Sequence, residues 1–314
     1  MRLASAGGRL QLQEGTELVD VATASGDRFP ADPQAIYPRW DEFRDWAAGR
    51  APARGPIAPP AQAGAPAPRP GQSVGIGVNY ADHAAEAAID LPTVPVVFPK
   101  FSSCIADPSA PLALSGDSVD WEVELVVVIG RTARRVDETD AWSHVAGLTI
   151  GQDISDRVLQ FTGPAPQQFG IGKSLPGFGP IGPWLVTPDE LADPDDLEIT
   201  CRLNGEIVQQ SRTKHLIFGV PDLVAYLSRQ LTLNPGDVIF TGTPAGVGYG
   251  RNPAVYLRPG DELVSCIEGL GELVTQVGPI RKGLPNGDCQ VTQPPGSEVK
   301  RGSGSRRGAW PTRR

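Results

Sequence analysis

Residues 120–130, DWEVELVVVIG, constrain the fold more than any other stretch of this 314-residue chain. Successive side chains of a β-strand point to opposite faces, so alternate residues share a face. One face would hold Asp120, Glu122, Glu124, Val126 and Val128, and the other Trp121, Val123, Leu125, Val127 and Ile129. The later residues are apolar on both faces, which predicts a buried strand with carboxylates at its entrance. Adjacent buried carboxylates are costly unless positive charge lies between them.

Short strands and turns are expected through much of the chain, because it contains 37 glycines and 32 prolines. The strongest hairpin signal is Asn204-Gly205, which lies between two alternating segments within residues 196–211. Residues 219–233 have the pattern of an amphipathic helix, and residues 235–248 that of a strand entering a glycine-rich loop. Many strands with a few interspersed helices indicate an α+β or mixed β fold rather than a doubly wound sheet.

The chain divides by composition into four segments. Residues 1–50 predict a small β-rich N-terminal unit, residues 51–71 a Pro/Ala-rich linker, residues 72–281 the main domain, and residues 282–314 a basic tail that we expect to be disordered. Residues 281–314 carry a net charge of +6, from eight Lys/Arg and two Asp/Glu. Because the whole chain has a net charge of −8, residues 1–280 carry −14. An acidic body argues against nucleic acid as the main partner.

Neither a membrane segment nor a cysteine-based site is expected. No apolar run approaches the roughly 20 residues that span a bilayer, and the first residues lack the apolar core of a signal peptide. A cytoplasmic location is therefore expected. The cysteines are scattered, with no C-x-x-C spacing, which suits neither a zinc site nor a disulfide framework; they are Cys104, Cys201, Cys266 and Cys289.

The carboxylates at the strand entrance are candidate metal ligands. Glu122 and Glu124 could equally be solvated charges on an exposed edge strand. Asp153 ends a second apolar strand; it could instead form a local turn, with Ser155 as a helix N-cap. If the two strands are neighbours, three carboxylates converge, and three oxygen donors without His or Cys suit a hard cation such as Mg²⁺.

Other candidate groups lie in three separate segments. His83 and Glu86 are three residues apart, so on a helix they would share a face and could form a general-base pair, or simply a solvated pair. Lys173 lies in a Gly/Pro-rich loop and could be a surface lysine. Residues 241–248, TGTPAGVG, offer backbone N–H groups and two threonine hydroxyls to an anionic group, or form only a tight turn.

Taken in order, several motifs resemble the fumarylacetoacetate hydrolase family, in particular its bacterial acylpyruvase and 2-hydroxyhepta-2,4-diene-1,7-dioate isomerase-like members. They are GIGVNYADHAAE, FPKFSS, DWEVELVVVIG, GLTIGQDISDRVLQ, GKSLPGFGPIGPWLVTPDEL, LNGEIVQQSRT and LNPGDVIFTGTPAGVG, and they span residues 72–278. The resemblance implies a mixed β-roll fold, a Mg²⁺ or Mn²⁺ ion and a homodimer. It implies Glu122, Glu124 and Asp153 as metal ligands and His83 and Glu86 as the catalytic pair. Substrate contacts would come from Lys173, Arg157, Gln160 and Thr243.

The activity that this resemblance implies is metal-dependent hydrolysis of a carbon–carbon bond in a β-diketo acid such as an acylpyruvate, through an enolate. Glu86, oriented by His83, would activate water, and Lys173 would stabilise the oxyanion. An isomerase or decarboxylase of an oxo-diacid on the same metal site is the alternative, and a non-catalytic metabolite-binding protein is a third. Four residues depart from the family pattern near the site, which bears on substrate identity: Gln152, Asp156, Val158 and Pro176.

Overall fold

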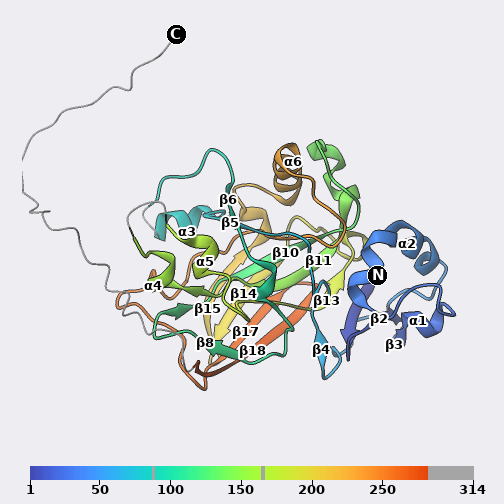
Figure 1. Ribbon diagram of the computed structural model, residues 1–314, viewed down its shortest axis with the longest axis horizontal. Helices are drawn as coiled ribbons and strands as arrows, with labels where there is room; N and C mark the ends of the chain where they lie inside the picture. Colours follow the sequence, from blue (N-terminus) through green and yellow to red (C-terminus); the bar gives the residue numbers. More distant parts are fainter. Residues whose placement is uncertain (87–88, 164–166, 282–314) are drawn as a thin grey trace, which may run out of the picture.

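The computed structural model describes residues 1–86, 89–163 and 167–281. The predicted basic tail and Cys289 lie outside these residues. In the described part, no helix is long and apolar enough to cross a membrane. Figure 1 shows the N-terminal elements at one end of the molecule and the helices α3 (Ala81–Glu86), α4 (Arg157–Gln160) and α5 (Phe169–Gly172) at the other.

The described strands form two main sheets and one small one. The larger runs in the order β3-β2-β1-β13-β11-β10-β16-β5-β6, with β4 paired to β1 and β7 to β13. Its strands are β1 (Arg2–Ala6), β2 (Arg9–Glu14), β3 (Glu17–Asp20), β4 (Ala63–Gly64), β5 (Ser73–Gly77), β6 (Val96–Pro99), β7 (Ile105–Ala106), β10 (Val123–Ile129), β11 (Val145–Gln152), β13 (Gly179–Val186) and β16 (Val238–Phe240).

The second sheet has the order β15-β14-β17-β18-β8, and a two-stranded piece joins β12 to β9. These strands are β8 (Leu112–Leu114), β9 (Val119–Asp120), β12 (Ser155–Asp156), β14 (Glu198–Leu203), β15 (Glu206–Arg212), β17 (Glu262–Ile267) and β18 (Gly271–Ile280). The hairpin predicted at Asn204-Gly205 is confirmed: both turn residues have positive φ, 52° and 87°. The mixture of sheets and short helices confirms the predicted α+β class.

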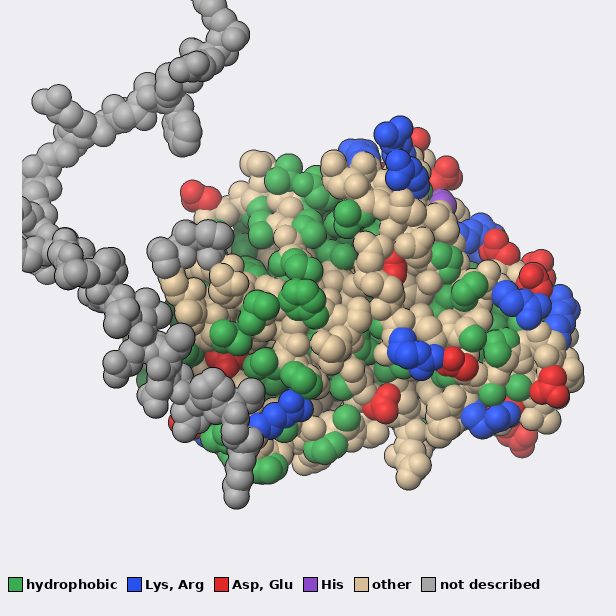
Figure 2. All heavy atoms as spheres, in the orientation of Figure 1, with side chains coloured by type: hydrophobic (Ala, Val, Ile, Leu, Met, Phe, Trp, Pro, Cys, Tyr) green, Lys and Arg blue, Asp and Glu red, His purple; other side chains and the backbone are tan. Residues whose placement is uncertain are grey.

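Helices cover the edges and faces of these sheets. The remaining α-helices are α1 (Val21–Ala24), α2 (Trp40–Ala48) and α6 (Val220–Gln230), and short 3₁₀ helices span η1 (Pro33–Arg39), η2 (Ser102–Cys104), η3 (Glu138–His144), η4 (Pro188–Glu190) and η5 (Thr213–His215). On the face seen in Figure 2, charged side chains gather over the end that carries α1 and α2, whereas the rest of that face is richer in apolar and uncharged groups.

Strand β10 lies at the centre of the core, and both of its faces are buried as predicted. Its Val123, Leu125, Val127 and Ile129 belong to a hydrophobic cluster that includes residues of the second sheet. The alternate residues, Val126 and Val128, belong to another cluster, which contains the apolar side chains of η1 and α2. The N-terminal elements therefore cover one face of the larger sheet, and the second sheet covers the other.

The four-segment division of the chain stays a prediction, and the structure adds two facts to it. Strand β1 pairs with β13, so the N-terminal strands continue the larger sheet. Within the Pro/Ala-rich segment, β4 pairs with β1, and Ala65 and Ala67 are buried in the cluster beneath α2. The later part of this segment is therefore packed against the body of the protein.

Candidate functional site

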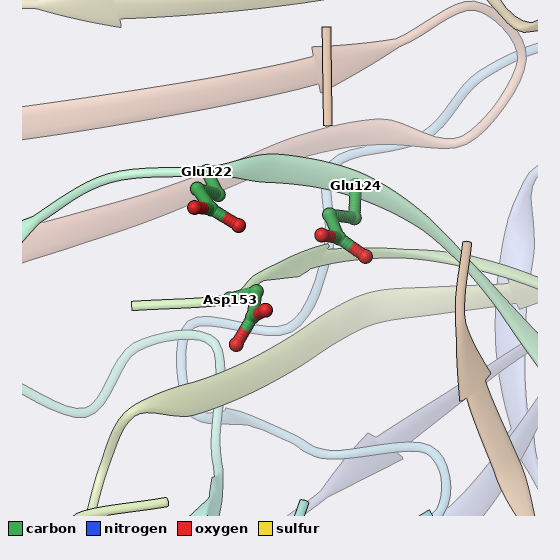
Figure 3. Close-up of side chains that lie close together, drawn as sticks. All are labelled: Glu122, Glu124 and Asp153. Carbon is green, nitrogen blue, oxygen red and sulfur yellow. The ribbon is translucent and has the colours of Figure 1, made fainter. Parts of the chain in front are cut away.

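Three carboxylates converge where β10 begins and β11 ends. The antiparallel pair matches Val123 with Gln152, which places Asp153 opposite Glu122; the Asp153 N–H donates to the Glu122 carbonyl at 2.9 Å. Ligand oxygens of Glu122, Glu124 and Asp153 lie within 4.8 Å of one another. Figure 3 shows Glu122 and Glu124 extending from one strand on the side where Asp153 lies. The prediction that these two strands are neighbours is confirmed, since β10 pairs with β11.

Buried cations surround this carboxylate cluster. The Lys173 ammonium lies 2.6 Å from Glu122 Oε2 and 2.7 Å from Asp153 Oδ2. The Lys100 ammonium lies 2.6 Å from Asp153 Oδ1 and also donates to the Lys173 and Phe178 carbonyls. Lys173 is therefore not a surface lysine, and Lys100 is a site residue that the sequence reasoning missed.

A third cation joins the cluster to Asp120. Arg157 Nη2 lies 2.8 Å from Glu122 Oε1 and 2.7 Å from Asp120 Oδ2, and Nη1 donates to Gln160 Oε1 at 2.8 Å. Asp120, the first carboxylate of the DWEVE stretch, thus pairs with Arg157 and is not part of the cluster of three. Four buried carboxylates face three cations here, so one negative charge is left uncompensated.

The imbalance falls on Glu124. Burial, and then the charges of Asp153 and Glu122, raises the pKa of Glu124 well above its usual range. Burial would also raise the pKa of Glu122, but Lys173 and then Arg157 outweigh it and lower that pKa to about 2. A buried set of three carboxylates with excess negative charge fits a hard divalent cation, for which oxygen ligands are preferred.

The predicted general-base pair is formed on α3. His83 Nδ1 lies 3.1 Å from Glu86 Oε2, and Glu86 Oε1 accepts the Gly246 N–H at 3.0 Å. Both carboxylate oxygens of Glu86 are thus held, one by the helix and one by the glycine-rich loop. The pair is partly shielded, since the two side chains are 14% and 18% exposed.

A left-handed backbone at Val78 leads from β5 into α3. Its φ of 53° is rare for a β-branched residue, and such conformations cost about 1–3 kcal/mol. The next residue holds it in place: the Asn79 side chain donates to the Thr241 and Phe218 carbonyls and accepts the Phe218 N–H. This strained turn directs α3, and with it His83 and Glu86, over the carboxylate cluster.

One cavity of about 530 Å³ is lined by residues of both the carboxylate cluster and the general-base pair. It is lined by His83, Glu86, Glu122, Glu124, Arg157, Gln160, Lys173 and Thr243, and its apolar wall is formed by Ile76, Val78, Phe98, Phe161, Phe169 and Val247, with Tyr249 beside them. The structure therefore brings together every predicted site residue; Asp153 alone is not on the lining surface and lies beneath it, against Lys100 and Lys173.

Some local predictions at the site are wrong. Ser155 is not a helix N-cap: it lies in β12, and Asp156 caps α4 by accepting the Leu159 N–H. The Thr243 hydroxyl already donates to the Val123 carbonyl and accepts a hydrogen bond from Gln209, so it has no hydrogen free for an anion. The substrate-binding role of Thr243 stays a prediction.

The four residues that depart from the family pattern do not line the cavity. Gln152 lies behind the cluster, where its side chain accepts the Glu122 N–H at 2.9 Å and donates to Ser265 at 2.8 Å. Asp156 caps α4 and is bonded by Ser115 and Ser118. Gln152 and Asp156 therefore bond to residues behind the cavity and do not form its surface.

Comparison with known proteins finds relatives of this chain. Oxaloacetate tautomerase FAHD2A, mitochondrial, from Bos taurus is 46% identical over 215 residues, 68% of each chain. The crystal structure of a candidate HpcE protein from Mycobacterium smegmatis has a TM-score of 0.84 and 52% identity, and the match covers 90% of this chain and all of that one.

A third structure, maleylpyruvate hydrolase from Sphingobium sp. SYK-6 in complex with manganese(II) and pyruvate, has a TM-score of 0.70 and 28% identity, with coverage of 90% of this chain and all of that one. The family model for the C-terminal part of fumarylacetoacetate (FAA) hydrolase matches residues 72–278. This chain therefore belongs to the fumarylacetoacetate hydrolase family.

Proposed function

We propose that this protein is a divalent-metal-dependent enzyme that acts on a 2-oxo acid by moving a proton at the carbon next to the carbonyl. The observation that carries the proposal is that the carboxylate cluster and the His83–Glu86 pair face one cavity. An electrophilic centre and a base facing a common cavity are the two parts that enolisation needs.

Glu122, Glu124 and Asp153 would hold the ion. When bound, Mg²⁺ or Mn²⁺ would supply Lewis-acid polarisation of the substrate carbonyl. The surrounding charges suit an anionic substrate: a divalent ion would convert the single uncompensated negative charge into a net charge of +1. Lys173 and Arg157, which line the cavity, would then attract the substrate carboxylate.

Glu86 would carry the proton. Its Oε2 is paired with His83 and its Oε1 with the Gly246 N–H, so the carboxylate has little freedom to rotate. A base fixed in this way presents its remaining lone pairs to the cavity at low reorganisation cost. Glu86 would accept a proton from the carbon next to the carbonyl and return it, with His83 keeping the carboxylate oriented.

The reaction favoured first is keto–enol tautomerisation or isomerisation of an oxaloacetate-like diacid. It needs only the base and the ion, and the bovine relative at 46% identity carries the name of an oxaloacetate tautomerase. Gln160 and Gln167, both on the lining surface, offer amide groups to a second carboxylate.

Hydrolysis of a carbon–carbon bond in an acylpyruvate is the second candidate. The apolar wall and the cavity of about 530 Å³ leave room for an acyl chain, and the maleylpyruvate hydrolase neighbour holds manganese and pyruvate. In this reaction Glu86 would take its proton from water, which would attack the distal carbonyl. The covering aromatic side chains of Phe161 and Phe169 would enclose the chain.

Product analysis separates the two reactions. Purified protein is incubated with oxaloacetate, acetylpyruvate or a longer acylpyruvate, with Mg²⁺ and then with excess chelator, and the products are followed by NMR. Metal-dependent interconversion of tautomers without cleavage would support the first candidate, and pyruvate plus a carboxylic acid would support the second. No metal-dependent change in any of these substrates would refute the proposed function.

A further inference from the structure

Asp120 is a fully buried carboxylate that belongs to neither the cluster of three nor the general-base pair. Its Oδ1 accepts the N–H groups of Trp121 at 2.8 Å and Gly248 at 2.7 Å. Its Oδ2 accepts the Tyr249 N–H at 2.9 Å and Arg157 Nε at 2.8 Å. A carboxylate that accepts hydrogen bonds from this many donors is held in one orientation.

Apart from the adjacent Trp121 N–H, the donors come from two segments that both reach the cavity. One is the loop that follows β16: Gly248 and Tyr249 bond to Asp120, and Gly246, two residues earlier, donates to Glu86 Oε1 at 3.0 Å. The other is the start of α4, where Arg157 lies against Glu122 Oε1 at 2.8 Å. Asp120 therefore lies between the base on one side and the metal cluster on the other.

The loop is shaped to reach this carboxylate. A Cβ added to Gly248 would lie 2.7 Å from Asp120 Oδ1 and 1.9 Å from the Val255 carbonyl, so only glycine permits the approach. Trp121, the neighbour of Asp120, donates its indole N–H to the Gly246 carbonyl at 3.2 Å. Gly246, whose N–H bonds Glu86, is thus held at its own carbonyl by Trp121, and Asp120 holds the two residues Gly248 and Tyr249 that follow in the same loop.

We propose that Asp120 is a positioning residue that holds residues 246–249 in place and so aligns Glu86. The role of Glu86 as the base rests on the proposed function; the mechanical link from Asp120 through Gly246 to Glu86 does not. Asp120 touches neither the cavity surface nor the metal cluster, so it would act only through these neighbours.

The Asp120→Asn variant of the full chain tests the link, because it keeps the size of the side chain and removes the charge. One oxygen becomes an NH₂ group, which cannot accept from the loop or from Arg157. The matched control is Asp117→Asn, three residues earlier, whose side chain is 87% exposed and lies 3.6 Å from Arg258.

The first readout is amide hydrogen exchange of the metal-free protein, which requires no substrate. We expect exchange at Gly248 and Tyr249 to rise by about tenfold to a hundredfold, as the loss of a hydrogen bond to a charged group implies. Exchange at Gly246 should rise with them. If Gly246 keeps its wild-type protection while Gly248 and Tyr249 lose theirs, Asp120 does not hold the peptide that orients Glu86, and the proposal is wrong.

The second readout is a double-mutant cycle on turnover with Glu86→Gln. Asp120→Asn should lower kcat at least about tenfold, leave the Mn²⁺ affinity within about threefold, and have no further effect when Glu86 is already Gln. Independent, multiplying losses would contradict action through Glu86. If the wild type turns over no substrate, the proposed function fails, and the exchange experiment still decides the link. If Asp120→Asn does not fold, Asp120→Glu carries the same two readouts, since it displaces the oxygens by one methylene.

Discussion

Lys100 offers the sharpest test of how the buried charges support the site. Its side chain is 0% exposed, and that of its partner Asp153 is 1% exposed. Burial would lower the pKa of Lys100, but Asp153 outweighs this and raises it, so the lysine stays charged. The perturbation is Lys100→Met, which keeps an unbranched four-atom side chain, with sulfur in place of Cδ, and removes the ammonium.

The expected cost follows from what the ammonium leaves behind. Asp153 Oδ1 loses a 2.6 Å ion pair with the ammonium. The Phe178 carbonyl loses a hydrogen bond of 3.3 Å, and the Lys173 carbonyl loses another hydrogen bond. Removing one partner of a buried ion pair costs about 3–5 kcal/mol. Lys173 would still pair with Asp153, but one more negative charge of the buried group would be left uncompensated. With an unfolding entropy of about 2.1 cal/mol/K per residue, that loss of stability lowers Tm by roughly 5–8 °C for a chain of this size.

Thermal and urea unfolding of the metal-free protein measure this loss. The control is Lys214→Met, whose side chain is 51% exposed and lies 3.0 Å from Asp196; an exposed pair of this kind contributes about 0–1 kcal/mol. If Lys100→Met lost no more stability than the control, the buried ion pair would not support the fold as described, and the charge count around the cluster would have to be revised.

Three further changes test other parts of the structure. Glu124→Ala should abolish Mn²⁺ binding measured by calorimetry, because it removes one of the three cluster carboxylates; binding at wild-type affinity would exclude the cluster as the metal site. Asp20→Ala should lose about 1 kcal/mol of stability at pH 7, since Asp20 caps α1 and pairs with Arg9 at 2.7 Å. Arg9 lowers the pKa of Asp20, so this contribution is complete above the ordinary pKa of about 3.9 and is lost progressively as pH falls from there through the lowered pKa; a difference that did not shrink between about pH 5 and pH 2 would contradict the assignment. Gly205→Ala should cost about 1 kcal/mol with unchanged kcat, because φ is 87° at a turn far from the cavity, and urea unfolding would show it.

Much of the fold could be predicted because local pattern and tertiary structure agree. The alternation along residues 123–129 assigned each side chain to one of two faces, and the two hydrophobic clusters divide the strand in the same way. The spacing of His83 and Glu86 predicted a shared helical face, and they form a hydrogen bond on α3. In both cases the period of the chain alone fixes which side chains are neighbours.

The parts that could not be predicted depend on contacts between distant segments. Lys100 follows a proline in an extended stretch, and nothing local distinguishes it from a surface lysine; its partner Asp153 is 53 residues away. Asp120 shares the strand pattern of Glu122 and Glu124, yet the strand is interrupted after β9, and its partners are Arg157 and a loop more than 100 residues later. Lysine burial and strand interruption are set by packing, which sequence periodicity does not report.

The measurement that tests the central claim most directly is the turnover of the Glu86→Gln variant on whichever 2-oxo acid the wild type converts. The control is Glu42→Gln, because Glu42 lies on α2 and its side chain is 55% exposed. With Mn²⁺ affinity verified by calorimetry, we expect the wild type and the control to react at the same metal-dependent rate and Glu86→Gln to react about 10²–10⁴ times more slowly. A Glu86→Gln variant that binds Mn²⁺ and retains the wild-type rate would contradict the assignment of Glu86 as the base and, with it, the proposed function of the cavity.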